Sequence, residues 1–313
     1  MQEAVILQQQ FNNVEGYQAQ WNRLKEGSTG LQKILQVMSE PSTALVFSHD
    51  DPDGITSGLI FKRTLEKKGW KVTYKLPEGF MLQPEQLEQA MKECPGAKAI
   101  FLLDKGTLAP YDKYADKLPV YIIDHHPAPA LPGKCVYFNP SVPAYTWCST
   151  SILAHGIATL SGTRDTFDDF LCLMGLKGDW AIEPVIGMLS NFAKPFFVEY
   201  AQKFKNLLTL VKERPTQFDA EQRDFTSLLS RVTEFVHATG GGGFSYFYHD
   251  REECLKNVNH AECIATALGA IADKAEQLTK IKSLDEFVNL LPQPQKGLLE
   301  KIFNYFLQDW ESA

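Results

Sequence analysis

The sequence predicts an α/β fold, in which a mostly parallel sheet is flanked by helices and followed by a largely helical C-terminal region. From Thr43 onward, short apolar runs alternate with helical stretches, an order typical of parallel strands covered on both faces. Beyond about residue 140, apolar residues recur mainly at helical spacing. The 313 residues, of which 44% are hydrophobic, suffice for two lobes.

Five apolar runs of strand length build the predicted sheet: Ala44–Ser48, Lys71–Leu76, Ala97–Asp104, Pro119–Asp124 and Val136–Asn139. Helices are predicted between them at Ile55–Lys68, at Pro84–Lys92 and near Tyr111–Asp116. The later helices are predicted in several segments between Pro184 and His237, and at Ser149–Leu160, Phe167–Leu176, Ala261–Leu278, Leu284–Leu291 and Lys296–Trp310.

We expect three regions along the chain. Residues 1–40 form a helical N-terminal arm, whose aromatic side chains, including Tyr17 and Trp21, pack on the rest of the protein or contact a partner. Residues 41–185 form the α/β domain, and residues 186–313 form the mainly helical C-terminal region.

The formal net charge of −7 argues against a protein that coats nucleic acid with a broad basic face. A phosphate-bearing substrate is compatible with this charge, because bound cations would supply positive charge and the protein would supply acidic ligands. The sequence shows no basic, apolar-cored leader and no long uncharged apolar run, so we expect a cytoplasmic protein without membrane contact. The six cysteines include no Cys-x-x-Cys pair, which favours reduced thiols over a cysteine metal site.

The first apolar run of the predicted sheet ends in a dense group of polar residues, 48–54, with the sequence SHDDPDG. Asp51 and Asp53 stand at alternate positions, from which their carboxylates can diverge toward two neighbouring cations. Gly54 permits a tight turn into the following helix, whose N-terminus also favours an anion. The alternative is an Asp-Pro-Asp-Gly turn that only caps this helix. We interpret Asp50 as a solvent-facing or supporting residue.

Two further runs of the sheet end in polar residues of the same kinds. Asp104 follows the third run, and Asp124, His125 and His126 follow the fourth. The carboxyl ends of neighbouring parallel strands meet at one edge of a sheet, where open α/β sheets collect their functional groups. Asp179, in a Gly-Asp-Trp sequence after a helical segment, is a fourth candidate. The alternatives are a strand-end turn at Asp104 and a helix cap at Asp179.

Together these motifs resemble the DHH phosphoesterase superfamily, and the opening motif is most similar to its RecJ-type nuclease branch. The resemblance covers roughly residues 43–180, with the aspartate-bearing motifs in order. It implies a DHH-like catalytic domain that holds two metal ions through six residues: His49, Asp51, Asp53, Asp104, His125 and Asp179.

The resemblance also implies that Asp104 bridges the two ions and that Asp53, Asp104 and His126 are the catalytic residues, with His126 beside the phosphate. Mixed carboxylate and imidazole ligands suit manganese, with magnesium, cobalt, iron or zinc as alternatives. Two such ions roughly 3.5–4 Å apart would clamp a phosphoryl group, activate water and stabilise the leaving oxygen. Because crowded aspartates repel one another, we expect the stability of the protein to depend on metal.

The superfamily usually carries a smaller substrate-binding domain with a Gly-Gly-His type of motif. Here the glycine run that begins at Gly240 is followed by Phe244. We therefore expect this domain to be divergent or missing. Gly241, Gly242 and Gly243 are expected either to contact the substrate or to form a loop without that role.

Three other side chains are candidates for substrate contacts. Lys105 and Lys177 are candidates for a phosphate contact, although lysines are usually solvated. Trp180 is a candidate for stacking on a base, although an aromatic residue among apolar neighbours is more often part of the core.

The function that the resemblance implies is hydrolysis of phosphodiester bonds in single-stranded nucleic acid, short oligonucleotides or related nucleotides. Phosphoanhydrides such as pyrophosphate or polyphosphate are the alternative substrates. A non-catalytic scaffold that binds nucleic acid or protein is the alternative from another class, but a scaffold need not keep the full ligand set found here. The helical regions leave room for a protein partner or for a homo-oligomer.

Overall fold

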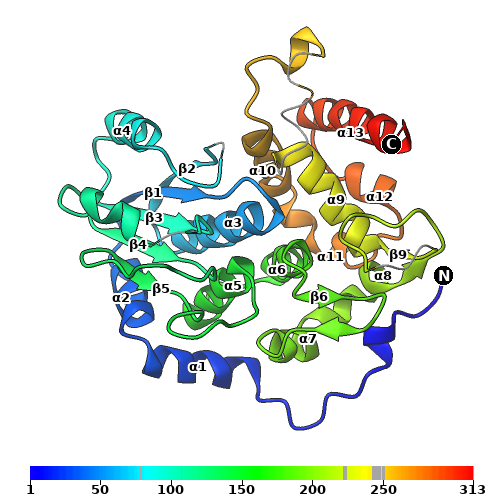
Figure 1. Ribbon diagram of the computed structural model, residues 1–313, viewed down its shortest axis with the longest axis horizontal. Coiled ribbons are helices and arrows are strands. Elements are labelled where there is room, and N and C mark those ends of the chain that lie inside the picture. Colours follow the sequence, from blue (N-terminus) through cyan, green and yellow to red (C-terminus); the bar gives the residue numbers. More distant parts are fainter. Residues whose placement is uncertain (78, 107, 221–223, 242–247, 249–250, 313) are drawn as a thin grey trace.

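A five-stranded, fully parallel sheet forms the centre of the α/β region (Figure 1). The computed structural model describes residues 1–77, 79–106, 108–220, 224–241, 248 and 251–312. For residues 311 and 312 it describes the backbone only. The strand order is β2-β1-β3-β4-β5. The strands are β1 (Thr43–Ser48), β2 (Lys71–Lys75), β3 (Ala99–Leu103), β4 (Val120–Ile123) and β5 (Val136–Phe138). The predicted α/β fold with a mostly parallel sheet is confirmed.

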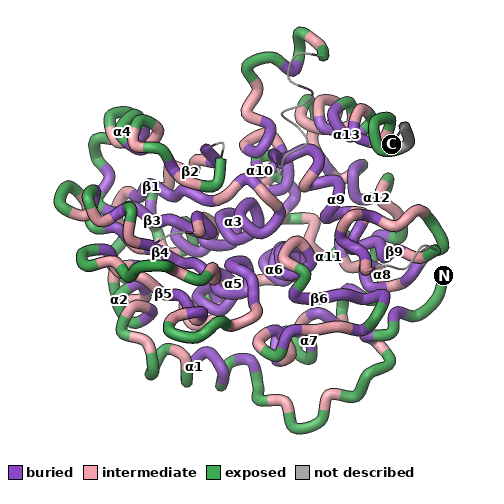
Figure 2. The backbone as a smooth tube through the Cα atoms, viewed as in Figure 1, coloured by how far each residue is buried: buried purple, intermediate pink, exposed green. Residues whose placement is uncertain are grey.

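Side chains of the central strands alternate between two hydrophobic layers, as the two-residue repeat of a strand dictates. On β1, Ala44 and Val46 pack with α3 (Pro52–Lys67) and α5 (Thr150–Leu160). Leu45 and Phe47 pack on the opposite face with α4 (Pro84–Glu93) and with η2 (Ala109–Tyr114), a 3₁₀ helix where we predicted a short α-helix. Both faces are therefore covered, and the three central strands β1, β3 and β4 are largely buried, whereas the edge strands β2 and β5 are partly exposed (Figure 2).

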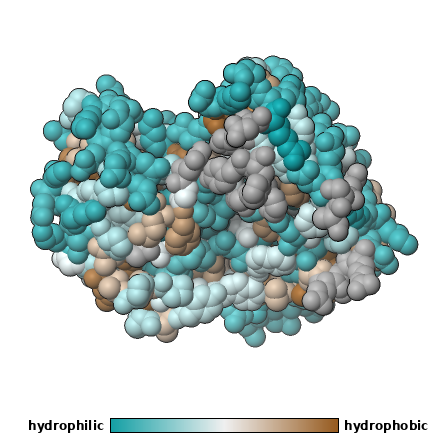
Figure 3. Space-filling view, turned by 45° about the horizontal axis from the view of Figure 1, so that its top comes forward, coloured by the Kyte–Doolittle hydropathy of each residue, from teal (hydrophilic) through white to brown (hydrophobic). Residues whose placement is uncertain are grey.

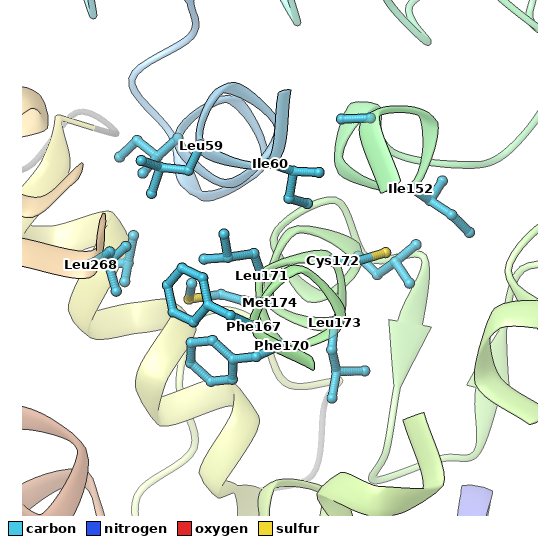
Figure 4. Packing of buried hydrophobic residues seen from close by; sticks show 14 of the residues in the cluster. Leu59, Ile60, Ile152, Phe167, Phe170, Leu171, Cys172, Leu173, Met174 and Leu268 are labelled. Atoms are coloured by element: carbon cyan, nitrogen blue, oxygen red, sulfur yellow. The ribbon is translucent and has the colours of Figure 1, made fainter. Parts of the chain in front are cut away.

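Helix α6 (Thr166–Gly178) lies in the middle of the largest hydrophobic cluster. Its apolar side chains point in several directions around the helix, toward Leu59 and Ile60 on α3, Ile152 on α5 and Leu268 on α10 (Figure 4). A helix that is apolar on all sides must be enclosed by other elements. The residue that ends α6 is therefore held in a fixed place relative to the sheet.

The N-terminal arm comprises η1 (Val5–Gln8), α1 (Tyr17–Gly27) and α2 (Thr29–Met38). Tyr17 and Trp21 on α1 are fully buried, and Tyr17 Oη lies 2.7 Å from His155 Nδ1 on α5. Trp21 lies directly over Gly156, where a Cβ atom would be 1.8 Å from the indole. Of the two roles predicted for these aromatic residues, the packing role is the one observed.

Helix α2 lies against β5, the strand at one edge of the sheet (Figure 1). The closest approach is at Gly30, where a Cβ atom would be 1.7 Å from the carbonyl oxygen of Tyr137. Only a glycine allows the helix to come so near to the backbone of the strand.

Replacement of Gly156 by alanine should destabilise the protein by about 1–3 kcal/mol, because the methyl group overlaps the buried ring of Trp21. Gly269→Ala is the matched control, since its methyl group would meet only a Leu59 side-chain atom at 3.8 Å. Urea unfolding of both variants measures the difference. Equal stability of the two variants would contradict close packing of the arm.

The C-terminal region is mainly helical, as predicted. Two short antiparallel strand pairs interrupt it, β6 (Ile182–Glu183) with β7 (Met188–Leu189) and β8 (Leu210–Val211) with β9 (Thr226–Ser227). The α-helices are α7 (Lys194–Glu199), α8 (Lys205–Leu208), α9 (Leu228–Gly240), α10 (His260–Gly269), α11 (Ala275–Leu278), α12 (Leu284–Val288) and α13 (Gln295–Ser312). The shorter 3₁₀ helices are η3 (Ala201–Phe204), η5 (Glu253–Leu255) and η6 (Ala272–Lys274).

The single helix predicted at Ala261–Leu278 is wrong, because α10 ends at Gly269 and two shorter helices follow. Glycine ends the regular helix because it stabilises the helical backbone poorly. Within the described residues, no helix is long and apolar enough to cross a membrane, and the face shown in Figure 3 is predominantly hydrophilic. The boundaries of the three regions along the chain stay a prediction.

Candidate metal centre

The carboxyl ends of three adjacent strands bring the predicted residues together. In the register of the sheet, Ser48 pairs with Leu103, and Leu103 pairs with Ile123. Asp104, which follows β3, therefore stands between the residues that follow β1 and those that follow β4. Figure 1 shows this edge of the sheet facing the helices of the C-terminal region.

A first cluster consists of His49, Asp51 and Asp104. His49 Nδ1 lies 2.9 Å from Asp51 Oδ2 and 3.8 Å from Asp104 Oδ2. The other oxygen of Asp51 accepts a 2.8 Å hydrogen bond from the backbone N–H of Gly54 at the start of α3. Asp51 thus caps the helix through one oxygen and faces the cluster with the other, so it is more than a helix cap.

A second cluster consists of Asp53, His125 and Asp179. His125 Nε2 lies 2.9 Å from Asp179 Oδ2 and 4.0 Å from Asp53 Oδ2. Both oxygens of Asp53 accept backbone N–H groups at the start of α5, from Thr150 at 2.6 Å and from Ser151 at 2.8 Å. These two donors fix the direction of the carboxylate. Asp179 ends α6 as its C-cap residue and also faces the cluster.

The carboxylate of Asp104 joins the two clusters. Its Oδ2 faces His49, while its Oδ1 lies 3.5 Å from His125 Nε2 and 3.6 Å from His126 Nδ1. The side chain is almost fully buried and accepts a 3.1 Å hydrogen bond from Thr150 Oγ1. Asp104 also has a φ of 56°, an uncommon conformation for a residue with a side chain, which persists only where the surroundings enforce it.

Asp124 supports the centre through hydrogen bonds to the backbone of the residues around it. One of its oxygens accepts the backbone N–H groups of His125 at 2.7 Å and His126 at 3.0 Å, and lies 2.8 Å from His126 Nδ1. The other oxygen accepts the backbone N–H of Gly106 at 2.7 Å. Asp124 therefore shapes the turn and orients the His126 ring. This role could not be predicted from the sequence, because it depends on backbone donors from two strand ends.

Burial and mutual repulsion shift the acid–base properties of the aspartates. Burial, together with the charge of Asp104, raises the pKa of Asp53 to about 7. Burial and the charge of Asp53 raise the pKa of Asp179 to about 7, and burial and Asp51 raise the pKa of Asp104 to about 6. Burial opposes the charged form of His49, yet Asp51 raises the pKa of His49 to about 9. This cluster of aspartates and histidines therefore requires protons or cations to balance its negative charge.

Several buried atoms of the centre lie at ion-pair distances from one another without well-aligned hydrogen bonds. Among the described residues, His49 Nδ1 faces Asp51 and His125 Nε2 faces Asp179 Oδ2 in this way. Buried polar atoms are almost always paired, and the ligand atoms within each cluster lie within 4.8 Å of one another. Nitrogen and carboxylate donors in this arrangement fit divalent cations such as manganese. The assignment of each residue as a metal ligand stays a prediction.

The glycine run approaches the first motif. A Cβ atom on Gly241 would be 2.7 Å from Asp50 Oδ2, and one on Gly240 would be 3.2 Å from the Asp50 carbonyl oxygen. Asp50 is itself buried, with Oδ1 3.3 Å from His49 Nε2, so it is a supporting residue and not a solvent-facing one. Gly242 and Gly243 lie outside the described residues.

The two candidate lysines are both fully buried. Lys177 Nζ donates a 2.5 Å hydrogen bond to Glu183, so its charge is already paired inside the protein. Lys105 Nζ donates to the carbonyl oxygen of Gly79 at 2.9 Å. Neither is a solvated lysine, and Lys177 does not face the centre as a phosphate contact. Trp180 is 40% exposed and is not a core residue.

Comparisons with known proteins agree with this geometry. Residues 43–171 match the model of the DHH family, N-terminal domain. Single-stranded-DNA-specific exonuclease RecJ of Bacillus subtilis (strain 168) is 29% identical over 132 residues, which are 40% of this chain and 17% of the relative. The chain thus spans less than a fifth of that protein.

Solved structures give more distant similarities. RecJ from Thermus thermophilus, in complex with Mn²⁺, is 16% identical with a TM-score of 0.48, over 91% of this chain and 39% of that one. An exopolyphosphatase-related protein from Bacteroides fragilis is 16% identical with a TM-score of 0.39, over 55% of each chain. Over residues 43–171 the chain is thus similar to the DHH family, N-terminal domain, and over 132 residues it is similar to a RecJ protein.

Proposed function

We propose that the protein is a metal-dependent phosphodiesterase that uses two divalent cations, with manganese as the preferred metal. The observation that carries this proposal is the position of Asp104, whose two oxygens face two separate clusters of aspartate and histidine. A single-ion site would not need a carboxylate with a cluster on each side. The mixed nitrogen and oxygen donors favour manganese.

Each side chain of the centre has a role in this proposal. His49, Asp51 and Asp104 would hold one cation, and Asp53, His125 and Asp179, with Asp104 shared, would hold the other. When bound, the cations polarise the phosphoryl group and lower the pKa of the attacking water. His126, oriented by its 2.8 Å contact with Asp124, would donate a hydrogen bond to the phosphate.

The proposed substrates are single-stranded nucleic acid, short oligonucleotides or related nucleotides. The printed name of the Bacillus subtilis relative, a single-stranded-DNA-specific exonuclease, supports this class. Phosphoanhydride hydrolysis is the second candidate, because the same ligand set would also bind pyrophosphate. We also propose a cytoplasmic location, which the free state of all six cysteines supports.

Hydrolysis of a substrate panel with Mn²⁺ tests the proposal. The panel contains end-labelled single-stranded DNA and RNA, dinucleotides, cyclic dinucleotides and pyrophosphate. Asp53→Asn should reduce cleavage by about a thousandfold or more, because a metal ligand is worth several kcal/mol of transition-state stabilisation. Asp116→Asn is the matched control, since Asp116 is 62% exposed and pairs only with Lys134 at the surface.

Three results are informative. Cleavage of nucleic acid or dinucleotides that disappears in Asp53→Asn, but not in Asp116→Asn, supports the proposal. Cleavage of pyrophosphate alone would replace it with the phosphoanhydride reaction. Binding of manganese without turnover of any substrate would favour the scaffold.

A further inference from the structure

One exposed aromatic ring stands at the margin of the metal centre. Phe80, in the loop between β2 and α4, leaves 43% of its surface exposed. The centre of its ring lies 5.2 Å from that of His49 and 5.4 Å from that of His126, nearly perpendicular to both. The same side chain therefore touches a predicted metal ligand and the histidine expected beside the phosphate.

The loop that carries Phe80 is held in place by polar contacts. Lys105, which is fully buried, donates from Nζ to the carbonyl oxygen of the preceding residue, Gly79, at 2.9 Å. Asn259, in the C-terminal region, donates to the carbonyl oxygen of Leu76 at 3.0 Å. Because burial of a lysine without a partner is costly, this hydrogen bond both satisfies the ammonium group of Lys105 and holds the backbone of Gly79 in place.

Gly106 packs against the ring of Phe80. A Cβ atom at this position would be 1.9 Å from Cζ of Phe80, and the backbone of Gly106 has a φ of 73°, which favours glycine. The backbone N–H of Gly106 is also a donor to Asp124, the residue that orients His126. The ring is thus seated on the same turn that shapes the centre, while part of its surface faces outward.

We infer that Phe80 stacks on a nucleobase of the substrate while the adjacent phosphate lies in the metal centre. This inference rests on the proposed function and narrows it to nucleoside phosphodiesters, because pyrophosphate has no ring to stack. Every base offers a π face, so an aromatic platform binds nucleotides with little sequence preference. An exposed ring next to a polar centre gains from such a ligand, which covers its apolar surface.

Two substrates that differ only in their bases test the inference. One is a dinucleotide, in deoxy and ribo forms, and the other is an abasic analogue with the same backbone. Affinity is measured by calorimetry with Ca²⁺ in place of Mn²⁺, and kcat/KM is measured with Mn²⁺. Phe80→Ala should lower affinity and kcat/KM for the dinucleotide by about 5- to 150-fold more than for the abasic analogue.

Two further variants separate stacking from packing. Phe80→Leu keeps an apolar group over Gly106 but cannot stack, so it should behave as Phe80→Ala does. Phe80→Trp keeps an aromatic ring and should retain the preference for the dinucleotide over the abasic analogue. Manganese content is measured for every variant, so that damage to the centre is recognised.

Equal losses on the two substrates would overturn the inference, because Phe80 would then act only as a wall of the centre. Unchanged affinity and kcat/KM in Phe80→Ala would overturn it too. The wild-type protein could cleave neither substrate and still bind the dinucleotide more tightly than the abasic analogue, with this difference lost in Phe80→Ala. That result would refute the proposed hydrolysis while supporting the stacking contact.

Discussion

Asp104→Asn is expected to abolish the binding of both cations and to slow hydrolysis by at least about a thousandfold. The reason is that Asp104 belongs to the first cluster through one oxygen, while its other oxygen lies 3.5 Å from His125 of the second, so one substitution should weaken two ion positions. Asparagine keeps the shape of the side chain and adopts the left-handed conformation of Asp104 readily. The backbone of the variant should therefore be preserved.

Asp179→Asn provides the comparison, because Asp179 belongs to the second cluster alone. Titration calorimetry with Mn²⁺ should detect one bound ion in Asp179→Asn and none in Asp104→Asn. Two ions bound to Asp104→Asn with wild-type affinity would refute the bridging role. Without cations, Asp104→Asn should be more stable than the wild type, since one of the crowded negative charges is gone.

Asp169→Asn is expected to lower the free energy of unfolding by about 3–5 kcal/mol. The carboxylate of Asp169 is fully buried on α6 and lies 2.7 Å from His155 Nε2. It also accepts hydrogen bonds from Arg164 Nη1 at 2.8 Å and from Lys203 Nζ. Loss of this charge leaves the partly buried cations Arg164 and Lys203 without their shared partner.

The effect of this substitution should depend on pH. Burial opposes ionisation of Asp169, but the hydrogen bond from His155 and the neighbouring cations hold its pKa below the ordinary value of 3.8. The stabilisation is therefore complete above the ordinary pKa and is lost as the pH falls through the lower folded-state pKa. The difference between wild type and variant should thus shrink below about pH 4. Urea unfolding between neutral and acidic pH measures it, and a difference that grows in acid would contradict the assignment.

The gathering of these side chains at one edge of the sheet could be predicted because most of them follow apolar strands directly. A strand that ends in aspartate or histidine indicates where a candidate metal ligand lies and which donor atom it offers. The parallel topology then brings Asp51, Asp104 and His125 to one edge of the sheet. The distances between side chains, and the left-handed backbone of Asp104, could not be predicted, because they depend on contacts between distant segments.

Supporting residues were harder to predict for a physical reason. Thr150 and Ser151 act through backbone N–H groups, which carry no sequence signal. Phe80 lies in a loop whose position is fixed by a buried lysine and by a residue of the C-terminal region. The sequence predicts a solvent-facing or supporting role for Asp50, because it sits among polar residues; its burial depends on the approach of Gly240 and Gly241 at the end of α9.

The approach of Gly30 to Tyr137 protects one edge of the sheet against pairing with other chains. An uncovered edge strand is a template on which another chain can add a strand, and β5 is such an edge. Helix α2 occupies this position at the level of Tyr137. Removal of the arm would therefore open the sheet to self-association, so a truncated chain would report aggregation and not the loss of a partner.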